Sequence, residues 1–272
     1  MPKVGIIQMT SGPDPQANLA YIKNQVASLA EQGAELIVTP ENSLVFGSRD
    51  DYHQMAEPLN QGIIQEQLSR IAQSERVFLV VGSLPIRRAE GVTTTSLVYD
   101  PQGHMLVHYD KLHMFDVDVA DSHQHYRESE TFIPGSQIVS LDTRVGHLGL
   151  SICYDLRFPH LYSELVQQGA NILLVPAAFT AVTGAAHWES LLRARAIENQ
   201  SWIVAANQTG VHPCGRETWG HSMVISPWGE VVASLSNCPD NLVVDLDLDR
   251  VDAIRAAMPT LKHIRFKTQL NV

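Results

Sequence analysis

The chain has 272 residues, 44% of them hydrophobic and 18% charged, and a formal net charge of −10 at pH 7. This is an ordinary composition for a globular protein with a substantial core, and the excess of carboxylates argues against nucleic acid or an anionic membrane as the main partner. No apolar stretch approaches the roughly 20 residues of a membrane span, and three cysteines are too few for a disulfide scaffold. We therefore expect a cytoplasmic protein with reduced thiols.

The first half of the chain predicts strand, helix, strand, helix, strand and then a β-hairpin. KVGIIQM (3–9) is typical of a strand, and ANLAYIKNQVASLAEQG (17–33) has apolar residues at helical spacing up to Gly33. The apolar runs LIV (36–38) and FLVV (78–81) are typical of strands buried on both faces. SLVYDPQGHML (96–106) places a Pro-x-Gly turn between two apolar runs, which indicates a hairpin.

The second half repeats this order with different residues. GHLGLSIC (146–153) predicts a strand and HLYSELVQQG (160–169) a helix, with Pro159 in its first turn. QQGANILLVP (167–176) resembles EQGAELIVTP (31–40), and SMVISPWGEVV (222–232) repeats the hairpin pattern. The sequence therefore predicts an α/β fold formed by one domain over residues 1–272, a four-layer α-β-β-α sandwich with an internal pseudo-two-fold duplication.

Three chemically distinct side chains follow predicted strands in this sandwich. Glu41 follows LIVTP, Lys111 follows the first hairpin, and Cys153 stands where a strand gives way to a helix. A helix N-terminus there would lower the pKa of the thiol. Judged alone, each residue also has an ordinary interpretation: a solvated loop carboxylate, a surface lysine paired with Asp110, and a buried structural cysteine.

The segments around these residues resemble the nitrilase superfamily of carbon–nitrogen hydrolases. TPEN, YDKLHMFDVD and SICYDLRFP are similar to its three signatures, and YRESETFIPG is similar to the stretch that carries a second active-site glutamate. The resemblance implies Glu41 as general base, Lys111 as cationic stabiliser, Cys153 as nucleophile and Glu128 as the second glutamate. It also implies the four-layer fold and a homodimer or larger homo-oligomer. In the reaction that these residues would catalyse, the backbone N–H of Tyr154 would stabilise the oxyanion together with Lys111, and no cofactor or metal is expected.

Subfamily features narrow the expected substrate, a small-molecule amide. HMFDVDVADSHQHYRESETF, AAFTAVTGAAHWESLLRARAIENQ and GRETWGHSMVISPWGEV resemble the branch that hydrolyses deaminated glutathione. An ω-amidase acting on 2-oxoglutaramate, or an amidase for another small amide, is the alternative.

Arg157 is a candidate to bind a carboxylate of the substrate; alternatively, it forms a structural ion pair with Asp155 or Glu164. Thr180 and Thr183 either line the pocket or form a turn, and the next helix is expected to open at His187 and Trp188 with Trp188 in the core.

Two functional classes are alternatives to a cysteine-dependent amidase. One is a metal hydrolase, whose ligands would be histidines and aspartates that cluster in the sequence. No HExxH or paired-cysteine spacing, which is typical of metal sites, occurs in the chain. The clustered residues are His104, His108, His113, His123, His125, Asp116, Asp118 and Asp121. A non-catalytic binding protein is the other alternative, because a fold can persist without its activity. The helices of the second half are expected to form contacts between subunits, because they carry the apolar residues Leu161, Leu165, Leu191 and Ile197.

Overall fold

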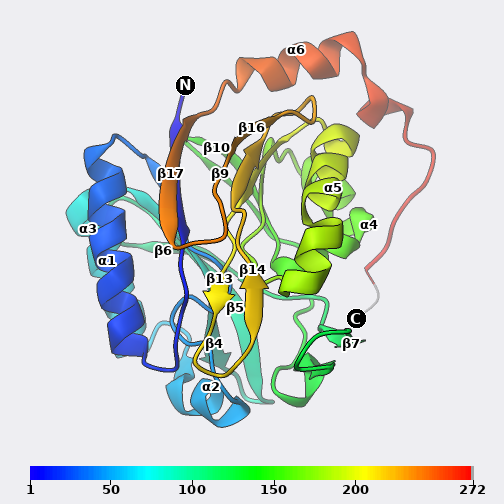
Figure 1. The fold of residues 1–272 in the computed structure, drawn as a ribbon. Coiled ribbons are helices and arrows are strands. Elements are labelled where there is room, and N and C mark those ends of the chain that lie inside the picture. Colours follow the sequence, from blue (N-terminus) through cyan, green and yellow to red (C-terminus); the bar gives the residue numbers. More distant parts are fainter. Residues whose placement is uncertain (271–272) are drawn as a thin grey trace.

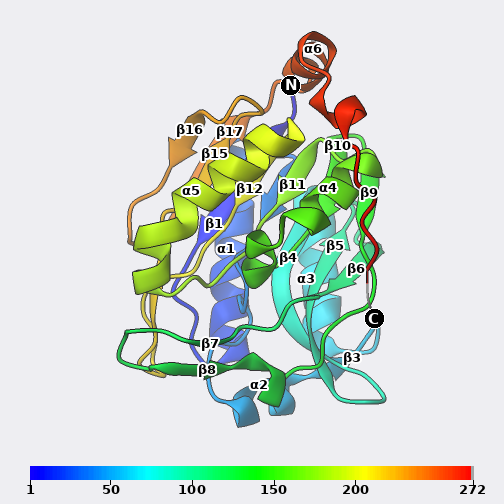
Figure 2. The same ribbon diagram turned by 90° about the vertical axis from the view of Figure 1, so that its right-hand side faces the viewer.

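The computed structural model describes residues 1–270 and has four layers (Figure 1). Two mixed β-sheets pack face to face. Helices α1 (Pro15–Glu31) and α3 (Ile63–Glu75) cover the outer face of the first sheet, and α4 (Pro159–Gln167) and α5 (Ala181–Asn199) cover that of the second (Figure 1, Figure 2). The predicted α-β-β-α sandwich is confirmed.

The first sheet combines a parallel centre with antiparallel edges. Its strand order is β17-β1-β2-β4-β5-β6, with β3 paired to β4. The bounds are β1 (Lys3–Gln8), β2 (Leu36–Val38), β3 (Glu57–Pro58), β4 (Phe78–Arg87), β5 (Val92–Tyr99), β6 (Met105–Asp110) and β17 (Asp240–Asp245). Strands β1, β2 and β4 are parallel, whereas β5 and β6 form the predicted antiparallel hairpin and β17 runs antiparallel to β1.

The second sheet also has a parallel centre and antiparallel edges. Its order is β16-β15-β12-β11-β10-β9, built from β9 (Ser140–Thr143), β10 (Gly146–Leu150), β11 (Ile172–Leu174), β12 (Trp202–Ala205), β15 (Met223–Ile225) and β16 (Val231–Ser234). Strands β10, β11 and β12 are parallel, β15 and β16 form the second hairpin, and β9 is the antiparallel edge beside β10. The two sheets thus share one topology, as the internal repeat predicts; its origin by duplication stays a prediction.

Alternation along the strands separates the two apolar layers of the first sheet. In β1, Val4 and Ile6 belong to the core between the sheets, whereas Ile7 belongs to the cluster under α1 and α3. Successive side chains of a strand point to opposite faces, so a strand buried on both sides must be apolar throughout. This explains the unbroken apolar run LIV in β2, whose three residues are all fully buried.

A capping side chain sets the start of α1, and a proline sets the start of α4. Helix α1 begins at Pro15, because the Asp14 side chain accepts hydrogen bonds from the backbone N–H groups of Gln16 and Ala17. The helix ends before Gly33, whose φ of +89° is the left-handed conformation that glycine adopts without strain. Helix α4 begins at Pro159 as predicted.

Helix α5 begins earlier than expected. It starts at Ala181 and not at His187, so the prediction for this boundary was wrong. Thr180 is its N-cap, and Gly184 packs so closely on Trp219 that an added Cβ would lie 2.3 Å from that side chain. Tertiary packing therefore stabilises a first turn that is rich in β-branched residues and glycine. Trp188 is fully buried, as expected, and its Nε1–H donates to the carbonyl of His221 at 2.8 Å.

The expected interface leucines are largely core residues. Leu161 and Leu165 are buried, and Leu191 packs against the main core. Only Ile197 of the four is exposed, at 48%. Leucine content therefore does not support an interface on these helices, because α4 and α5 use their leucines to cover the second sheet.

The remaining elements are short. Two hairpins, β7 (Asp116–Asp118) with β8 (His125–Arg127) and β13 (Thr209–Val211) with β14 (Glu217–Trp219), form separate two-stranded sheets. Helices α2 (Arg49–Met55) and α6 (Asp249–Ala257) and the 3₁₀ turns η1 (Glu128–Glu130), η2 (Cys153–Arg157) and η3 (Thr260–His263) complete the chain. None of the helices within residues 1–270 has the length and apolar character needed to cross a bilayer.

Candidate active site

A pocket at one end of the sandwich is lined by all eight residues that the sequence analysis assigned to catalysis or substrate binding. Its lining includes Glu41, Lys111, Glu128 and Cys153, together with Tyr154, Arg157, Thr180 and Thr183. The β7–β8 and β13–β14 hairpins also contribute side chains to its wall. The pocket is partly enclosed and open to solvent, so a small molecule can enter it.

The loop after β2 holds Glu41 in a buried position. The backbone N–H of Thr39 donates to Val80 O at 3.0 Å, and the amide of Gln208 donates to Glu41 O at 2.9 Å. Gly82 passes directly beneath this loop, where an added Cβ would lie 2.2 Å from the carbonyl oxygen of Thr39. Only glycine permits this close approach. Glu41 is consequently 3% exposed and is not a solvated loop carboxylate.

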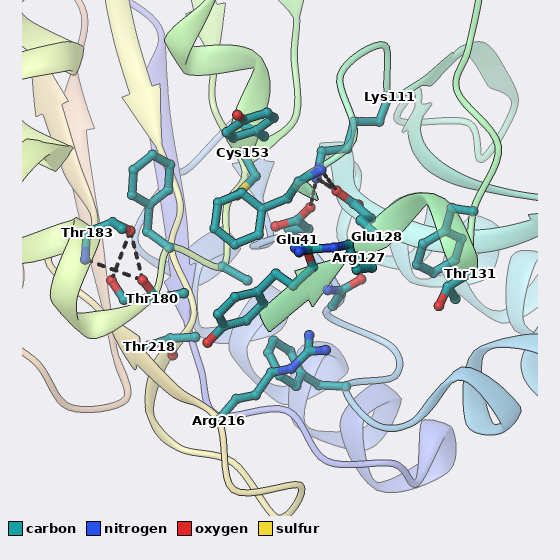
Figure 3. Close-up of a pocket in the computed structure, with 18 of the residues that line it drawn as sticks. Glu41, Lys111, Arg127, Glu128, Thr131, Cys153, Thr180, Thr183, Arg216 and Thr218 are labelled. Atoms are coloured by element: carbon teal, nitrogen blue, oxygen red, sulfur yellow. Dashed lines mark hydrogen bonds and ion pairs between the residues drawn. The ribbon is translucent and has the colours of Figure 1, made fainter. Parts of the chain in front are cut away.

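Lys111 lies between two carboxylates. Its Nζ donates to Glu41 Oε1 at 2.7 Å and to both oxygens of Glu128 at 2.8 and 2.9 Å (Figure 3). Asp110, the alternative partner, is bound instead by Arg88 and by the hydroxyl of Thr95. The side chain of Lys111 is fully buried, so these charge-assisted bonds fix the ammonium group with little freedom.

A strained turn projects Cys153 into the pocket. Its φ is +48°, a left-handed conformation that costs a non-glycine residue on the order of 1 kcal/mol. The backbone N–H of Cys153 donates to Pro176 O at 2.8 Å and stabilises the turn. The residue opens the short 3₁₀ turn η2, and α4 starts only at Pro159. The thiol therefore lies six residues before Pro159, so the expectation that it sits at a helix N-terminus was wrong, although α4 itself begins where predicted.

The electrostatic surroundings of Cys153 also differ from the prediction. Burial raises the pKa of the thiol well above its usual range, Glu41 raises it further, and Lys111 lowers it only in part. Burial lowers the pKa of Lys111, but Glu128 and Glu41 outweigh this effect and hold it well above the ordinary value. Burial and Glu41 raise the pKa of Glu128 against the opposing effect of Lys111. The expectation of a lowered thiol pKa was wrong, because burial and the nearby carboxylate of Glu41 both raise it.

Asp155 connects the two loops that carry Lys111 and Cys153, a role that sequence analysis missed. Its fully buried carboxylate accepts hydrogen bonds from the hydroxyl of Tyr109 at 2.7 Å and the backbone N–H of Ile152 at 2.9 Å. It also accepts from the backbone N–H of His113 at 3.1 Å and contacts that residue's Nδ1 at 2.7 Å. Asp155 thereby fixes the position of the lysine loop relative to the thiol turn. The segment YDLRFP contained this aspartate, but nothing in the sequence identified its partners.

The predicted substrate-binding residues line the pocket in different ways. Thr180 and Thr183 both form a turn and line the pocket, so the two interpretations of these residues hold together (Figure 3). Their hydroxyl oxygens lie 2.8 Å apart, and Thr180 is the N-cap of α5. Within residues 1–270, Arg157 forms no ion pair with Asp155 or Glu164. Its guanidinium lies over the rings of Tyr154 and Phe179, 5.9 and 5.3 Å from their centroids. The ion-pair alternative for Arg157 was wrong.

Arg216 was also missed as a pocket residue. It follows the turn of the β13–β14 hairpin, and its guanidinium lies 5.8 Å from the ring centroid of Phe46 and 5.4 Å from that of Tyr126. The ring of Phe46 stacks on the buried imidazole of His212, with centroids 3.8 Å apart. The sequence GRETWG gives no periodic signal for such a position, because a residue in a loop is placed by tertiary contacts.

We expect the buried imidazole of His212 to make the free energy of unfolding depend on pH. His212 Nδ1 lies 2.8 Å from Ser11 O and Nε2 lies 2.8 Å from Thr218 Oγ1. Burial lowers the pKa of His212 to about 4, whereas the unfolded chain takes up this proton near pH 6.5. The unfolded state therefore binds more protons between these values, so we expect stability to fall as the pH drops from 6.5 towards 4, by roughly 3 kcal/mol from this residue.

The measurement is the free energy of unfolding in denaturant at pH 7 and pH 4.5 for the protein and its His212→Gln variant. The wild-type loss should exceed the variant's loss, while His104→Gln, at an exposed position, should behave like the wild type. Equal pH slopes for the wild type and His212→Gln would show that this histidine is protonated alike in both states.

The histidines that cluster in sequence are dispersed in space. His104 contacts Asp100, His113 contacts Asp155, and His125 contacts Asp118. Within residues 1–270, no three His, Cys, Asp or Glu side chains come together in a way that could hold a metal ion. The histidines thus take part in separate polar contacts, and no shared donor set is formed.

A family model described as carbon-nitrogen hydrolase matches residues 3–256. The chain belongs to the carbon-nitrogen hydrolase family. It is an amidase-type hydrolase of carbon–nitrogen bonds other than peptide bonds, with the fold of the nitrilase superfamily. Among curated relatives, "Deaminated glutathione amidase" of Yersinia enterocolitica is 46% identical over 98% of this chain and 94% of the relative.

Two solved structures illustrate the shared fold of this carbon-nitrogen hydrolase. Saccharomyces cerevisiae Nit3, a member of branch 10 of the nitrilase superfamily, is 29% identical with a TM-score of 0.85 over 97% of each chain. A mutant of the amidase from Nesterenkonia sp. AN1 is 30% identical with a TM-score of 0.81, over 96% of this chain and 99% of the other. That structure shows the Michael addition of acrylamide at its active site cysteine.

Proposed function

We propose that Cys153 is the nucleophile and Glu41 the general base of an amidase. Both side chains are buried and line one pocket, and the carboxylate of Glu41 is close enough to raise the pKa of the thiol. Because the pKa of the thiol is raised, a standing thiolate is disfavoured, and Glu41 takes the proton as the sulfur attacks the amide carbon. The same carboxyl group then gives the proton to the departing amine.

Lys111 supplies positive charge to the negatively charged oxygen of the tetrahedral intermediate. Its ammonium is already fixed by Glu41 and Glu128, so little reorganisation is needed when negative charge develops. The backbone N–H of Tyr154, in the first turn of η2, is the second donor we propose. Glu128 keeps Lys111 in place and is itself held by the backbone N–H of Phe115 at 2.6 Å.

Collapse of this intermediate breaks the carbon–nitrogen bond and leaves a thioester on Cys153. Glu41, again unprotonated once the amine has left, removes a proton from water as the water oxygen attacks the thioester carbon. When the second intermediate breaks down, the carbon–sulfur bond breaks, Glu41 returns the proton to the sulfur, and the carboxylic acid is released. Each proton is accounted for by one carboxyl group beside the sulfur, and no step calls for a cofactor.

We propose deaminated glutathione as the substrate, hydrolysed to 2-oxoglutarate and cysteinylglycine. The observation that carries this proposal is similarity over almost the whole chain to relatives named deaminated glutathione amidase, from 46% identity in Yersinia enterocolitica to 37% in the human protein. An ω-amidase acting on 2-oxoglutaramate would form the same acyl-enzyme, a 2-oxoglutaryl thioester. The leaving group is what distinguishes them: cysteinylglycine in one case and ammonia in the other.

The test compares kcat/KM for deaminated glutathione and 2-oxoglutaramate. We expect deaminated glutathione to be preferred by well over tenfold, because contacts remote from the scissile bond can stabilise the transition state. Deacylation should proceed at the same rate from both substrates, since the thioester is identical. Equal efficiencies would support a broad ω-amidase, and a preference for 2-oxoglutaramate would contradict the proposed substrate.

Hydrolysis itself separates an enzyme from a binding protein. A protein that binds these amides without releasing 2-oxoglutarate, and whose Cys153 resists alkylation, would be the non-catalytic alternative. Assembly into a homodimer or larger homo-oligomer and a cytoplasmic location stay predictions, and neither enters the chemistry proposed above.

A further inference from the structure

The proposed substrate carries two carboxylates at opposite ends. One belongs to the 2-oxo acid that becomes the acyl group, and the other belongs to the glycine of the leaving group. Fully extended, cysteinylglycine spans about 7 Å, so its carboxylate lies well away from the reacting carbon. A site that discriminates this substrate from 2-oxoglutaramate needs a cation at that distance, on the leaving-group side.

Three guanidinium groups line the pocket, and they differ in their partners. Arg127 is engaged, because it donates to Asp118 at 2.8 Å and to the carbonyls of Val117 and Tyr126. Arg157 and Arg216 have no carboxylate partner among residues 1–270. A half-buried guanidinium without a counter-ion is a strong potential ligand for a carboxylate, which it can bind through two parallel hydrogen bonds.

Arg216 is held in place by aromatic rings and by the hairpin backbone. Its guanidinium lies near the faces of Phe46 and Tyr126, and its carbonyl accepts a hydrogen bond from the backbone N–H of His212 at 2.8 Å. The stacked pair of Phe46 and His212 supports one side of this arrangement. Such contacts limit the motion of the side chain while leaving its N–H donors free for a ligand.

The two guanidiniums that lack a carboxylate partner among residues 1–270 come from different walls of the pocket, and Arg157 Nη1 lies 3.3 Å from His187 Nδ1. Arg157 lies four residues after the nucleophile, in the same five-residue turn. Arg216 comes from the β13–β14 hairpin and lies across the pocket from Cys153 (Figure 3). Two cations on different walls, with Cys153 beside one of them, match a substrate that has a carboxylate on each side of its reacting carbon.

We propose that Arg216 binds the glycine carboxylate of the leaving group and so determines the preference for deaminated glutathione. This inference rests on the proposed function and adds the residue that carries its specificity. Arg157 remains the candidate for the carboxylate of the 2-oxo acid, which both rival substrates share. A purely structural Arg216, stacked on Phe46 and Tyr126 to support the hairpin, would instead affect all substrates alike.

The experiment measures kcat/KM for the wild type, Arg216→Gln and Arg216→Lys on three substrates. These are deaminated glutathione, its glycinamide analogue in which the glycine carboxylate is a carboxamide, and 2-oxoglutaramate. We expect the wild type to prefer the acid over the glycinamide by about 10- to 100-fold, the range of hydrogen bonds between charged groups. Arg216→Gln should remove this preference, and Arg216→Lys should retain part of it because it keeps the charge without the paired donors.

A matched control is Arg70→Gln, an exposed arginine of α3 that pairs with Glu66 at 2.5 Å. It should leave all three efficiencies and the acid-to-glycinamide ratio unchanged. Thermal unfolding of each variant shows whether the fold is kept, and the substrate ratio remains informative even if a variant is less stable.

Two outcomes would overturn the inference while leaving the proposed function intact. In the first, the wild type hydrolyses deaminated glutathione but does not prefer it over the glycinamide. In the second, Arg216→Gln loses kcat/KM equally on all three substrates. Failure of the wild type to hydrolyse deaminated glutathione would contradict the proposed function, and the inference would fall with it.

Discussion

Replacing Cys153 by alanine is expected to lower turnover by roughly 10⁴-fold or more, because the variant cannot form a thioester. The side chain is small and buried, so alanine fills most of its volume and the fold should persist. The measurement is release of 2-oxoglutarate, together with mass spectrometry of the protein mixed with substrate. The wild type should carry a 2-oxoglutaryl adduct during turnover, and Cys153→Ala should not.

Cys214 offers a matched control for this experiment. It is an exposed free cysteine on the loop of the β13–β14 hairpin, and it takes no part in the proposed chemistry. Cys214→Ala should retain both the adduct and turnover. If Cys153→Ala hydrolysed the amide at a rate comparable to the wild type, the assignment of the nucleophile would be wrong.

The second large effect is expected for Glu41→Gln. Glutamine has nearly the same shape and can still accept a hydrogen bond from Lys111, but it cannot carry the proton from the thiol to the amine. Both formation and hydrolysis of the thioester should slow by about 10²- to 10⁴-fold, the usual contribution of general acid–base catalysis. Single-turnover measurements separate the two steps.

Glu66→Gln provides the control for the loss of a carboxylate, since Glu66 is an exposed residue of α3. It should match the wild type in both steps. A Glu41→Gln variant that formed the thioester at the normal rate would place the base elsewhere, with Glu128 as the next carboxylate beside Lys111.

Much of the fold was predictable because the local patterns agree with the tertiary structure. Apolar runs such as LIV in β2 predict strands that are buried on both faces, and the Pro-x-Gly turns predict the β5–β6 and β15–β16 hairpins. The meeting of Glu41, Lys111 and Cys153 could also be anticipated, since each follows a strand and the two sheets share one topology.

Other features depend on contacts that the sequence does not display. The start of α5 is fixed by the packing of Gly184 on Trp219, which overrides the weak helix propensity of that turn. The raised pKa of Cys153 follows from its depth in the pocket and from Glu41, which arrives from a distant segment. Arg216 lies on a hairpin loop whose position is set by the aromatic residues beneath it.

The shared topology of the two sheets has a consequence for where catalysis resides. Glu41 and Lys111 follow strands of the first sheet, and Cys153 follows a strand of the second, so neither half contains a complete reactive centre. The distance between Glu41 and Cys153, the proposed base and nucleophile, is set by how the sheets pack, through the core between them that includes Val4, Leu36 and Leu148. Substitutions in this core between the sheets would therefore change the relative position of the two side chains. The reaction rate can in this way evolve through residues that do not contact the substrate.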